Sequence, residues 1–200
     1  AQGAKLLHVV DLDGALSGKL KNLDSVERIT KAVSIPVQLG GGIRTQESID
    51  KVLSTGVSRV ILGTRACEDE IFIQNVIANM GEKIVVSIDA RDGMVATEGW
   101  TSVSKIKATD LVKKLELFGL KVLIYTDISR DGTLKGPNIE SLKEILEARE
   151  KAVVISSGGI SSLDDLLKLK ELEPQGLLGA IIGKAIYEKK LKLKEAIEKC

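Results

Sequence analysis

The chain contains few residues of the kinds that build disulfides, metal sites or aromatic cores. Its 200 residues include two cysteines, one histidine and only 2% aromatics. Cys67 and Cys200 are too few for a disulfide framework and lack metal-ligand spacing, so a reduced, cytoplasmic setting is expected. The single histidine, His8, argues against a histidine-ligated zinc site and against a catalytic triad. No metal site is therefore expected.

Charge and hydropathy argue against two further classes of partner. The formal net charge of +1 gives no electrostatic reason to bind nucleic acid. No apolar run approaches the roughly 20 residues that a membrane-spanning helix requires. The hydrophobic fraction is nevertheless 44%, which supports a sizeable core of aliphatic side chains. Short continuous runs such as KIVVSI and VLIYT are typical of parallel strands that are covered on both faces.

Apolar runs and polar helix starts alternate along the whole chain. The expected strands cover residues 6–11, 35–40, 58–63, 83–89, 121–127, 152–156 and 179–183. The expected helices cover residues 22–33, 46–55, 68–79, 106–118, 138–149, 162–171 and 187–198. No linker or low-complexity segment interrupts this alternation, so we expect one domain over residues 1–200.

The sequence contains the same pattern twice. Residues 36–66 and 152–186 each run from an apolar strand through Gly-Gly-Ile and a helix start to a second apolar strand, which ends in Gly-Thr or Gly-Lys. Upstream of both copies, HVVDLDG aligns with IYTDISRDG, so that Asp11 corresponds to Asp127. Regular spacing of this kind indicates a duplicated architecture with two equivalent halves.

The duplication predicts an α/β fold, a (β/α)8 TIM barrel with a two-fold internal repeat. The second half has an additional strand, residues 83–90, for which the first half has no counterpart. We therefore expect seven of the eight strands here, without the first strand and most of the first helix. An open doubly wound sheet is less consistent with this duplication, because that fold carries one glycine-rich turn after its first strand rather than matching glycine loops in both halves. The two unpaired sheet edges would favour self-association.

Glycine clusters end four of the expected strands, where the active site of such a barrel lies. Glycine lets backbone N–H groups approach a phosphate closely, and a following helix N-terminus adds a favourable dipole. A single pair would be read as a tight turn without ligand, but the symmetric occurrence favours phosphate binding at both ends of one substrate. The expected cradles are Gly41 and Gly42 with Gly63 and Thr64, and Gly158 and Gly159 with Gly183 and Lys184.

Two polar residues at strand ends are candidates for the chemistry. Asp89 emerges from the apolar strand KIVVSIDA into the expected barrel mouth, where a carboxyl group suits general acid or base catalysis. It could instead form a cap or a salt bridge in the loop that leads to Arg91. Thr126 could hydrogen-bond a reacting group. By contrast, Asp11 and Asp13 are better suited to shaping a loop than to catalysis.

Three further residues have both a binding and an ordinary structural interpretation. Arg44 follows the first glycine cluster and could clamp an anion through two hydrogen bonds, or form a surface salt bridge. Asp131 lies in the loop TDISRDGT but is also typical of a turn. Trp100, the only tryptophan, follows Asp89 in the long polar loop ARDGMVATEGWTS. It could stack on a flat heterocycle or anchor the loop on the barrel rim.

Several motifs together resemble one enzyme family over the full length of the chain. They are HVVDLDGA, LGGGIR, ILGT, SIDARDG followed by EGW, YTDISRDGTLKGPN and SSGGISS. They resemble the histidine-biosynthesis isomerase family that acts on phosphoribosylformimino-5-aminoimidazole carboxamide ribotide (ProFAR), often called HisA. The resemblance implies a TIM barrel, a substrate with two phosphates, and an Amadori rearrangement of an aminoaldose to an aminoketose without a metal or organic cofactor.

The resemblance also implies roles for individual residues. Asp89 would be the general acid that opens the ribose ring, and Trp100 would stack on the imidazole. Thr126 and Asp131 would line the reacting sugar, and Arg44 would contact substrate. The family's general base is an Asp at the end of the first strand, which has no counterpart here, so we expect severely reduced activity. Full-length members are expected to be monomers that bind neither nucleic acid nor membrane.

Three alternatives share many of these motifs. One is the bifunctional enzyme that also isomerises phosphoribosylanthranilate, which the loops of one sequence do not exclude. Another is the related cyclase of the same pathway, imidazole glycerol phosphate synthase, although the EGW and YTDISRDGTLKGPN segments favour the isomerase. The third is a barrel fragment that binds phosphate without turning substrate over.

Overall fold

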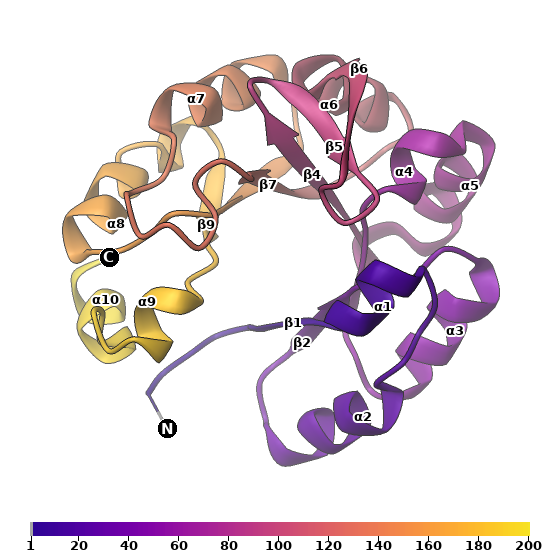
Figure 1. The fold of residues 1–200 in the computed structure, drawn as a ribbon, viewed down its shortest axis with the longest axis horizontal. Helices are drawn as coiled ribbons and strands as arrows, with labels where there is room; N and C mark the ends of the chain where they lie inside the picture. The colour runs from indigo at the N-terminus through magenta and orange to yellow at the C-terminus, as the bar shows by residue number, and fades with distance from the viewer. Residues whose placement is uncertain (1) are drawn as a thin grey trace.

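A computed structural model describes residues 2–200, in which seven parallel strands form one sheet that curves around a central space (Figure 1). Each strand pairs with its neighbour along the path β1-β2-β3-β4-β7-β8-β9. This order confirms the expected β/α-barrel class. The strands are β1 (Leu7–Val10), β2 (Val37–Gly40), β3 (Arg59–Leu62), β4 (Ile84–Arg91), β7 (Val122–Asp127), β8 (Val153–Ser157) and β9 (Leu177–Ala180).

Helices follow the strands and lie mostly on the outside of the sheet, as Figure 1 shows. Their apolar faces pack on the outer faces of the strands, so the largest hydrophobic cluster lies between the two layers. The helices are α1 (Leu12–Ser17), α2 (Leu23–Ala32), α3 (Gln46–Ser54), α4 (Arg65–Glu68), α5 (Glu70–Met80), α6 (Ala108–Leu117), α7 (Ile139–Ala148), α8 (Leu163–Lys170), α9 (Lys184–Tyr187) and α10 (Leu193–Lys199), with short 3-10 turns at Gly81–Lys83 and Glu173–Gln175.

Two expected elements are wrong in their bounds. The last strand was expected at residues 179–183 but ends at Ala180. The helix expected at residues 187–198 is two helices, α9 and α10, because Lys189 adopts a left-handed φ of 57° that stops a right-handed helix.

The polar loop expected after Asp89 is largely a β-hairpin. Strand β5 (Met94–Thr97) pairs antiparallel with the end of β4 and with β6 (Ser102–Lys107). Its tip turns through three residues with positive φ, at Glu98, Gly99 and Trp100. The hairpin therefore carries Trp100 on a defined turn instead of a structureless loop.

A second, smaller apolar cluster fills the inside of the sheet. It consists of Ile61, Val85, Val122, Ile124 and Ile155, which come from neighbouring strands. Side chains two apart on a strand share a face, so the next inward residues lie at the carboxyl ends of the strands. These inward positions are polar or glycine, which creates a polar layer above an apolar floor.

Asp11 stabilises the loop after β1, as its expected loop-shaping role requires. Its side chain accepts hydrogen bonds from the backbone N–H groups of Gly14 (2.9 Å), Lys21 (2.8 Å) and Asn22 (3.0 Å), and from the Asn22 side-chain amide (2.7 Å). Burial opposes ionisation, but these four hydrogen bonds outweigh it and hold the pKa of Asp11 below its ordinary value of 3.8.

Asp127 accepts an equivalent set of hydrogen bonds from its loop in the second half. Its carboxylate accepts from the backbone N–H (2.9 Å) and the hydroxyl (2.6 Å) of Ser129, and from the Asn138 side-chain amide (2.6 Å). The partner asparagine lies eleven residues downstream in both cases, at Asn22 and Asn138. The internal repeat is therefore visible in side-chain hydrogen bonds as well as in topology.

We predict that Asp11→Ala destabilises the fold by about 3 kcal/mol, because three backbone donors lose their acceptor. Asp13→Ala is the matched control, since Asp13 accepts only one exposed side-chain hydrogen bond, from Asn22. Urea unfolding at neutral pH measures both variants. Because the pKa of Asp11 is lowered in the fold, its contribution is lost as pH falls below 3.8, and the difference from the wild type should shrink there. Equal losses of unfolding free energy in both variants would contradict the stabilising role of the Asp11 hydrogen bonds.

Candidate active site

A cavity of about 740 Å³ opens at the carboxyl ends of the parallel strands. This volume is in the ordinary range for small-molecule sites. All of the residues that the sequence nominated for catalysis or binding line it: Gly41, Gly42, Arg44, Gly63, Thr64, Asp89, Trp100, Thr126, Asp131, Gly158, Gly159, Gly183 and Lys184. Parallel strands bring distant segments to one edge, which is why residues so far apart in sequence meet here.

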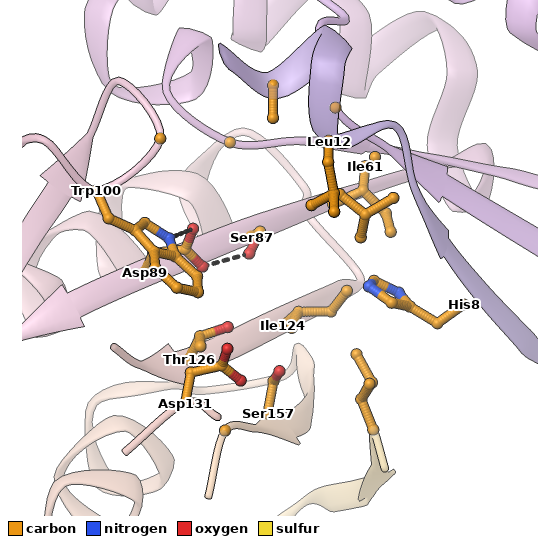
Figure 2. A pocket seen from close by; sticks show the side chains of 18 of the residues that line it. His8, Leu12, Ile61, Ser87, Asp89, Trp100, Ile124, Thr126, Asp131 and Ser157 are labelled. Carbon is orange, nitrogen blue, oxygen red and sulfur yellow. Dashed lines mark hydrogen bonds between the residues drawn. The ribbon is translucent and has the colours of Figure 1, made fainter. Parts of the chain in front are cut away.

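Three polar side chains stand side by side across the strand ends. In the sheet register Asp89 on β4 pairs with Thr126 on β7, and Thr126 pairs with Ser157 on β8. Figure 2 shows these side chains, with Asp131, around one part of the cavity. A substrate atom placed there would meet a carboxyl group and two hydroxyl groups, a set that can donate, accept and transfer protons.

Both oxygens of Asp89 accept a hydrogen bond. The Ser87 hydroxyl donates to Oδ1 at 2.8 Å, and the Trp100 indole N–H donates to Oδ2 at 2.7 Å, as the dashed lines in Figure 2 show. Sequence reasoning missed Ser87. The signal was present, because residues two apart on a strand share a face and Ser87 therefore points into the same lumen as Asp89.

The hairpin tip rests on the site through two hydrogen bonds. Besides the indole contact to Asp89, the backbone N–H of Glu98 donates to the hydroxyl of Thr64 at 3.0 Å. The tip thus engages a candidate catalytic carboxylate and a candidate phosphate-binding hydroxyl at once. Trp100 itself is 39% exposed and has a φ of 72°, which is uncommon for a bulky residue.

The paired glycines are required by packing between neighbouring loops. A Cβ on Gly41 would lie 2.2 Å from the backbone oxygen of Asp11, and φ at Gly41 is 104°. A Cβ on Gly158 would lie 3.0 Å from the backbone oxygen of Asp127, and φ there is 94°. The tight-turn interpretation of these pairs is thus sufficient to explain why glycine stands there.

Gly63 and Gly183 differ from the paired glycines. Neither has a positive φ, and among residues 2–200 a Cβ on either would meet nothing within 4 Å. No neighbour in this described part of the chain therefore requires glycine at these two positions, which both line the cavity. A ligand that approaches the backbone closely would require it, and this is the stronger argument for two anion cradles.

Two cations lie beside these cradles. Arg44 follows the first glycine pair, its guanidinium packs against Gly18, and within residues 2–200 it forms no ion pair with a carboxylate. The Lys184 ammonium donates to the backbone oxygen of Gly132 at 2.7 Å and lies 3.7 Å from Glu188. The surface salt bridge considered for Arg44 is therefore not seen in the part of the chain that the structure describes.

His8 lies on the inner wall of the cavity, where Figure 2 places it beyond Ile124 from Asp89. Its Nδ1 is 3.0 Å from the Nε2 of Gln38, a fully buried side chain of β2. Burial lowers the pKa of His8 below 6.5, and the charge of Asp89 opposes this only in part. The imidazole is therefore neutral at physiological pH.

Asp131 faces the same part of the cavity as Asp89. Burial against the cavity wall, and then repulsion from Asp89, raise its pKa above 3.8, while the Gly132 backbone and Lys184 act in the opposite direction.

Other kinds of site have no support within residues 2–200. No three histidine, cysteine or carboxylate side chains there gather closely enough to hold a metal ion. Over the same residues, every helix is too short or too polar to cross a lipid bilayer. Burial also raises the pKa of the Cys67 thiol to about 11, so this side chain, which packs against the hydrophobic core, remains protonated.

We predict that Gly41→Ala and Gly63→Ala separate packing from ligand binding. Gly41→Ala should destabilise the fold by more than about 3 kcal/mol, because a new Cβ meets backbone at a positive φ. Gly63→Ala should leave stability within about 0.5 kcal/mol but weaken binding of inorganic phosphate. Urea unfolding and calorimetric titration provide the two readouts. Unchanged phosphate affinity in Gly63→Ala would count against the first cradle.

We also predict that the only histidine titrates below its ordinary value. Proton NMR should give a pKa below 6.5 for His8, and Asp89→Asn should lower it further, because the charge that favours the imidazolium is removed. Since the unfolded chain binds the proton more readily, His8 favours folding above pH 6.5 and this contribution is lost as pH falls. A higher pKa in Asp89→Asn would contradict the predicted interaction.

Known proteins resemble this chain in sequence. The family described as histidine biosynthesis protein matches residues 1–192. A protein of Gloeothece citriformis is 52% identical over 98% of this chain and 76% of its own length. A protein of Bacillus cereus strain Q1 is 51% identical over 98% of this chain and 80% of its own length. Both are named 1-(5-phosphoribosyl)-5-((5-phosphoribosylamino)methylideneamino) imidazole-4-carboxamide isomerase. The chain belongs to the histidine biosynthesis protein family.

Proposed function

We propose that this protein is the isomerase of histidine biosynthesis that converts ProFAR by an Amadori rearrangement. The observation that carries the proposal is the position of Asp89, which lies in one cavity with two unobstructed glycine turns, at Gly63 and Gly183. The relatives named as this isomerase, about half identical over nearly the whole chain, support the same reaction. The substrate class is a sugar-linked imidazole with a phosphate at each end.

The two cradles hold the two phosphates and so orient the molecule across the cavity. In the first half, the turns at Gly41 and Gly63 offer backbone N–H groups, and Arg44 adds a cation without a competing carboxylate among residues 2–200. In the second half, the turns at Gly158 and Gly183 do the same, with Lys184 beside them. Fixing both ends places the reacting ribose between them and lowers the entropic part of the barrier.

Asp89 is the general acid for the first step. It donates a proton to the ring oxygen of the aminoaldose ribose while the C1–O bond breaks and the nitrogen lone pair forms a C=N bond, which gives an open-chain Schiff base. Loss of the proton from C2 then gives an enolamine, and protonation at C1 with loss of the C2 hydroxyl proton forms the C2 carbonyl of the aminoketose. Thr126 and Ser157 hydrogen-bond the sugar during these steps, a role that their position next to Asp89 in the sheet register supports.

The proton from C2 requires a base. The resemblance places this base on an Asp at the end of a strand that precedes β1, for which residues 2–200 contain no counterpart. We propose that extending the chain at its N-terminus with such a strand, ending in Asp, raises turnover. We further propose that the enzyme acts in the cytoplasm. We also propose that it acts as a monomer, because the acid and the glycine turns of both proposed phosphate sites line one cavity within one chain.

We predict that Asp89→Asn lowers kcat for ProFAR by about 10²–10⁴-fold, because the amide keeps the shape of the carboxyl but cannot donate its proton. KM should change little, since the phosphates are bound elsewhere. Asp92→Asn is the matched control: this exposed carboxylate lies in the hairpin turn at a φ of 51°, which asparagine also tolerates. Steady-state assays use the N-terminally extended protein as well as residues 1–200. Comparable kcat in both aspartate variants would refute the assignment of Asp89.

A further inference from the structure

The two donors that hold Asp89 differ in kind. Trp100 comes from an exposed hairpin tip, and its indole N–H can only donate. Ser87 comes from the middle of β4, which pairs with β3 on one side and β7 on the other. Its chain neighbours Val86 and Ile88 are fully buried. The serine contact is thus anchored in the sheet, whereas the tryptophan contact depends on where the tip lies.

The two hydrogen bonds differ in what they leave open on Asp89. The Trp100 indole N–H lies 2.7 Å from Oδ2 and so covers one side of the oxygen that would present a proton to the sugar. Movement of the hairpin tip away from Oδ2 would open that side to the substrate. The Ser87 hydroxyl, in contrast, donates to an ionised Asp89 and can accept from a protonated one, so it can stay in contact through both states.

We propose that Ser87 is a positioning residue that holds Oδ1 of Asp89 and thereby directs Oδ2 toward the substrate once Trp100 has moved away. This inference rests on the proposed function, since it concerns the acid of that reaction. After the tip has left, Ser87 is the one remaining donor to Asp89 among the hydrogen bonds of the described residues. Without it, the carboxyl group would be free to rotate about its Cβ–Cγ bond.

Three titratable side chains near Asp89 must remain unchanged in any test of Ser87. The charge of Asp89 acts on His8 of β1, on Cys67 of α4 and on Asp131 of the loop after β7. Replacing Ser87 leaves all three side chains in place. Ser87→Ala removes the hydroxyl, and Ser87→Thr keeps a hydroxyl on a residue type that suits strands. Ser102→Ala on exposed β6 is the matched control, since its side chain makes no hydrogen bond within residues 2–200.

The first experiment is steady-state turnover of ProFAR by the N-terminally extended protein. Ser87→Ala should lower kcat about tenfold with KM within about twofold, and Ser87→Thr should recover most of the loss. Ser102→Ala should leave both constants unchanged. An unchanged kcat in Ser87→Ala, an equally large change in KM, or a loss that Ser87→Thr does not recover would overturn the proposal.

The second experiment needs no turnover and so separates this inference from the proposed function. Crystal structures compare the orientation of the Asp89 carboxyl group between variants, all in the Trp100→Phe background, which removes the indole donor. The carboxyl group should keep its orientation in that background and after addition of Ser102→Ala, and should turn about its Cβ–Cγ bond after addition of Ser87→Ala. An unchanged orientation with Ser87→Ala would refute the role of Ser87 even in an active enzyme, while a turned carboxyl group in a protein that does not isomerise ProFAR would refute only the reaction.

Discussion

The contact between each glycine pair and the neighbouring loop is the constraint on which the site depends. The backbone of Gly41 lies against the loop that Asp11 holds, and that of Gly158 lies against the loop that Asp127 holds. Because the aspartates satisfy loop N–H groups internally, the loops can be short and closely packed. The turns at Gly63 and Gly183 differ, because a Cβ at either would meet no atom within 4 Å among residues 2–200. The same packing that stabilises the rim thus leaves space beside these two turns, both of which line the cavity.

The two halves share this scaffold, and the second half also carries an antiparallel hairpin. Its strands, β5 and β6, follow β4, the strand for which the first half has no counterpart within residues 2–200. Its tip brings Trp100 over Asp89 and the Glu98 N–H onto Thr64. The hairpin therefore covers the carboxyl group, while both halves contribute glycine turns to the cavity. Under the proposed function, this division suits a substrate with a phosphate at each end and a reacting centre between them.

Much of this arrangement could be predicted from the sequence, for identifiable reasons. Continuous apolar runs followed by glycine or Asp predicted the strands and placed Asp89 at the mouth, because strand ends converge at one edge of a parallel sheet. The hairpin was missed because TEGWTS is polar and its turn depends on positive φ at Glu98 and Trp100, which composition does not indicate. Ser87 was missed because a serine inside an apolar strand carries no signal until its partner on the same face is considered.

The asymmetry of the Asp89 hydrogen bonds links this scaffold to the reaction. A strand residue whose chain neighbours are both buried cannot change position easily, and a hairpin tip that is partly exposed can. Under the proposed role of Ser87, the carboxyl group is therefore held by one donor of fixed position and one that can leave. If both donors were fixed, the indole would keep one side of Oδ2 closed to the sugar; if both could leave, the carboxyl would lose its orientation when the substrate arrives. One rigid and one releasable donor provide orientation and access together, and the fold achieves this by placing Ser87 on β4 and Trp100 on the hairpin that extends from the same strand.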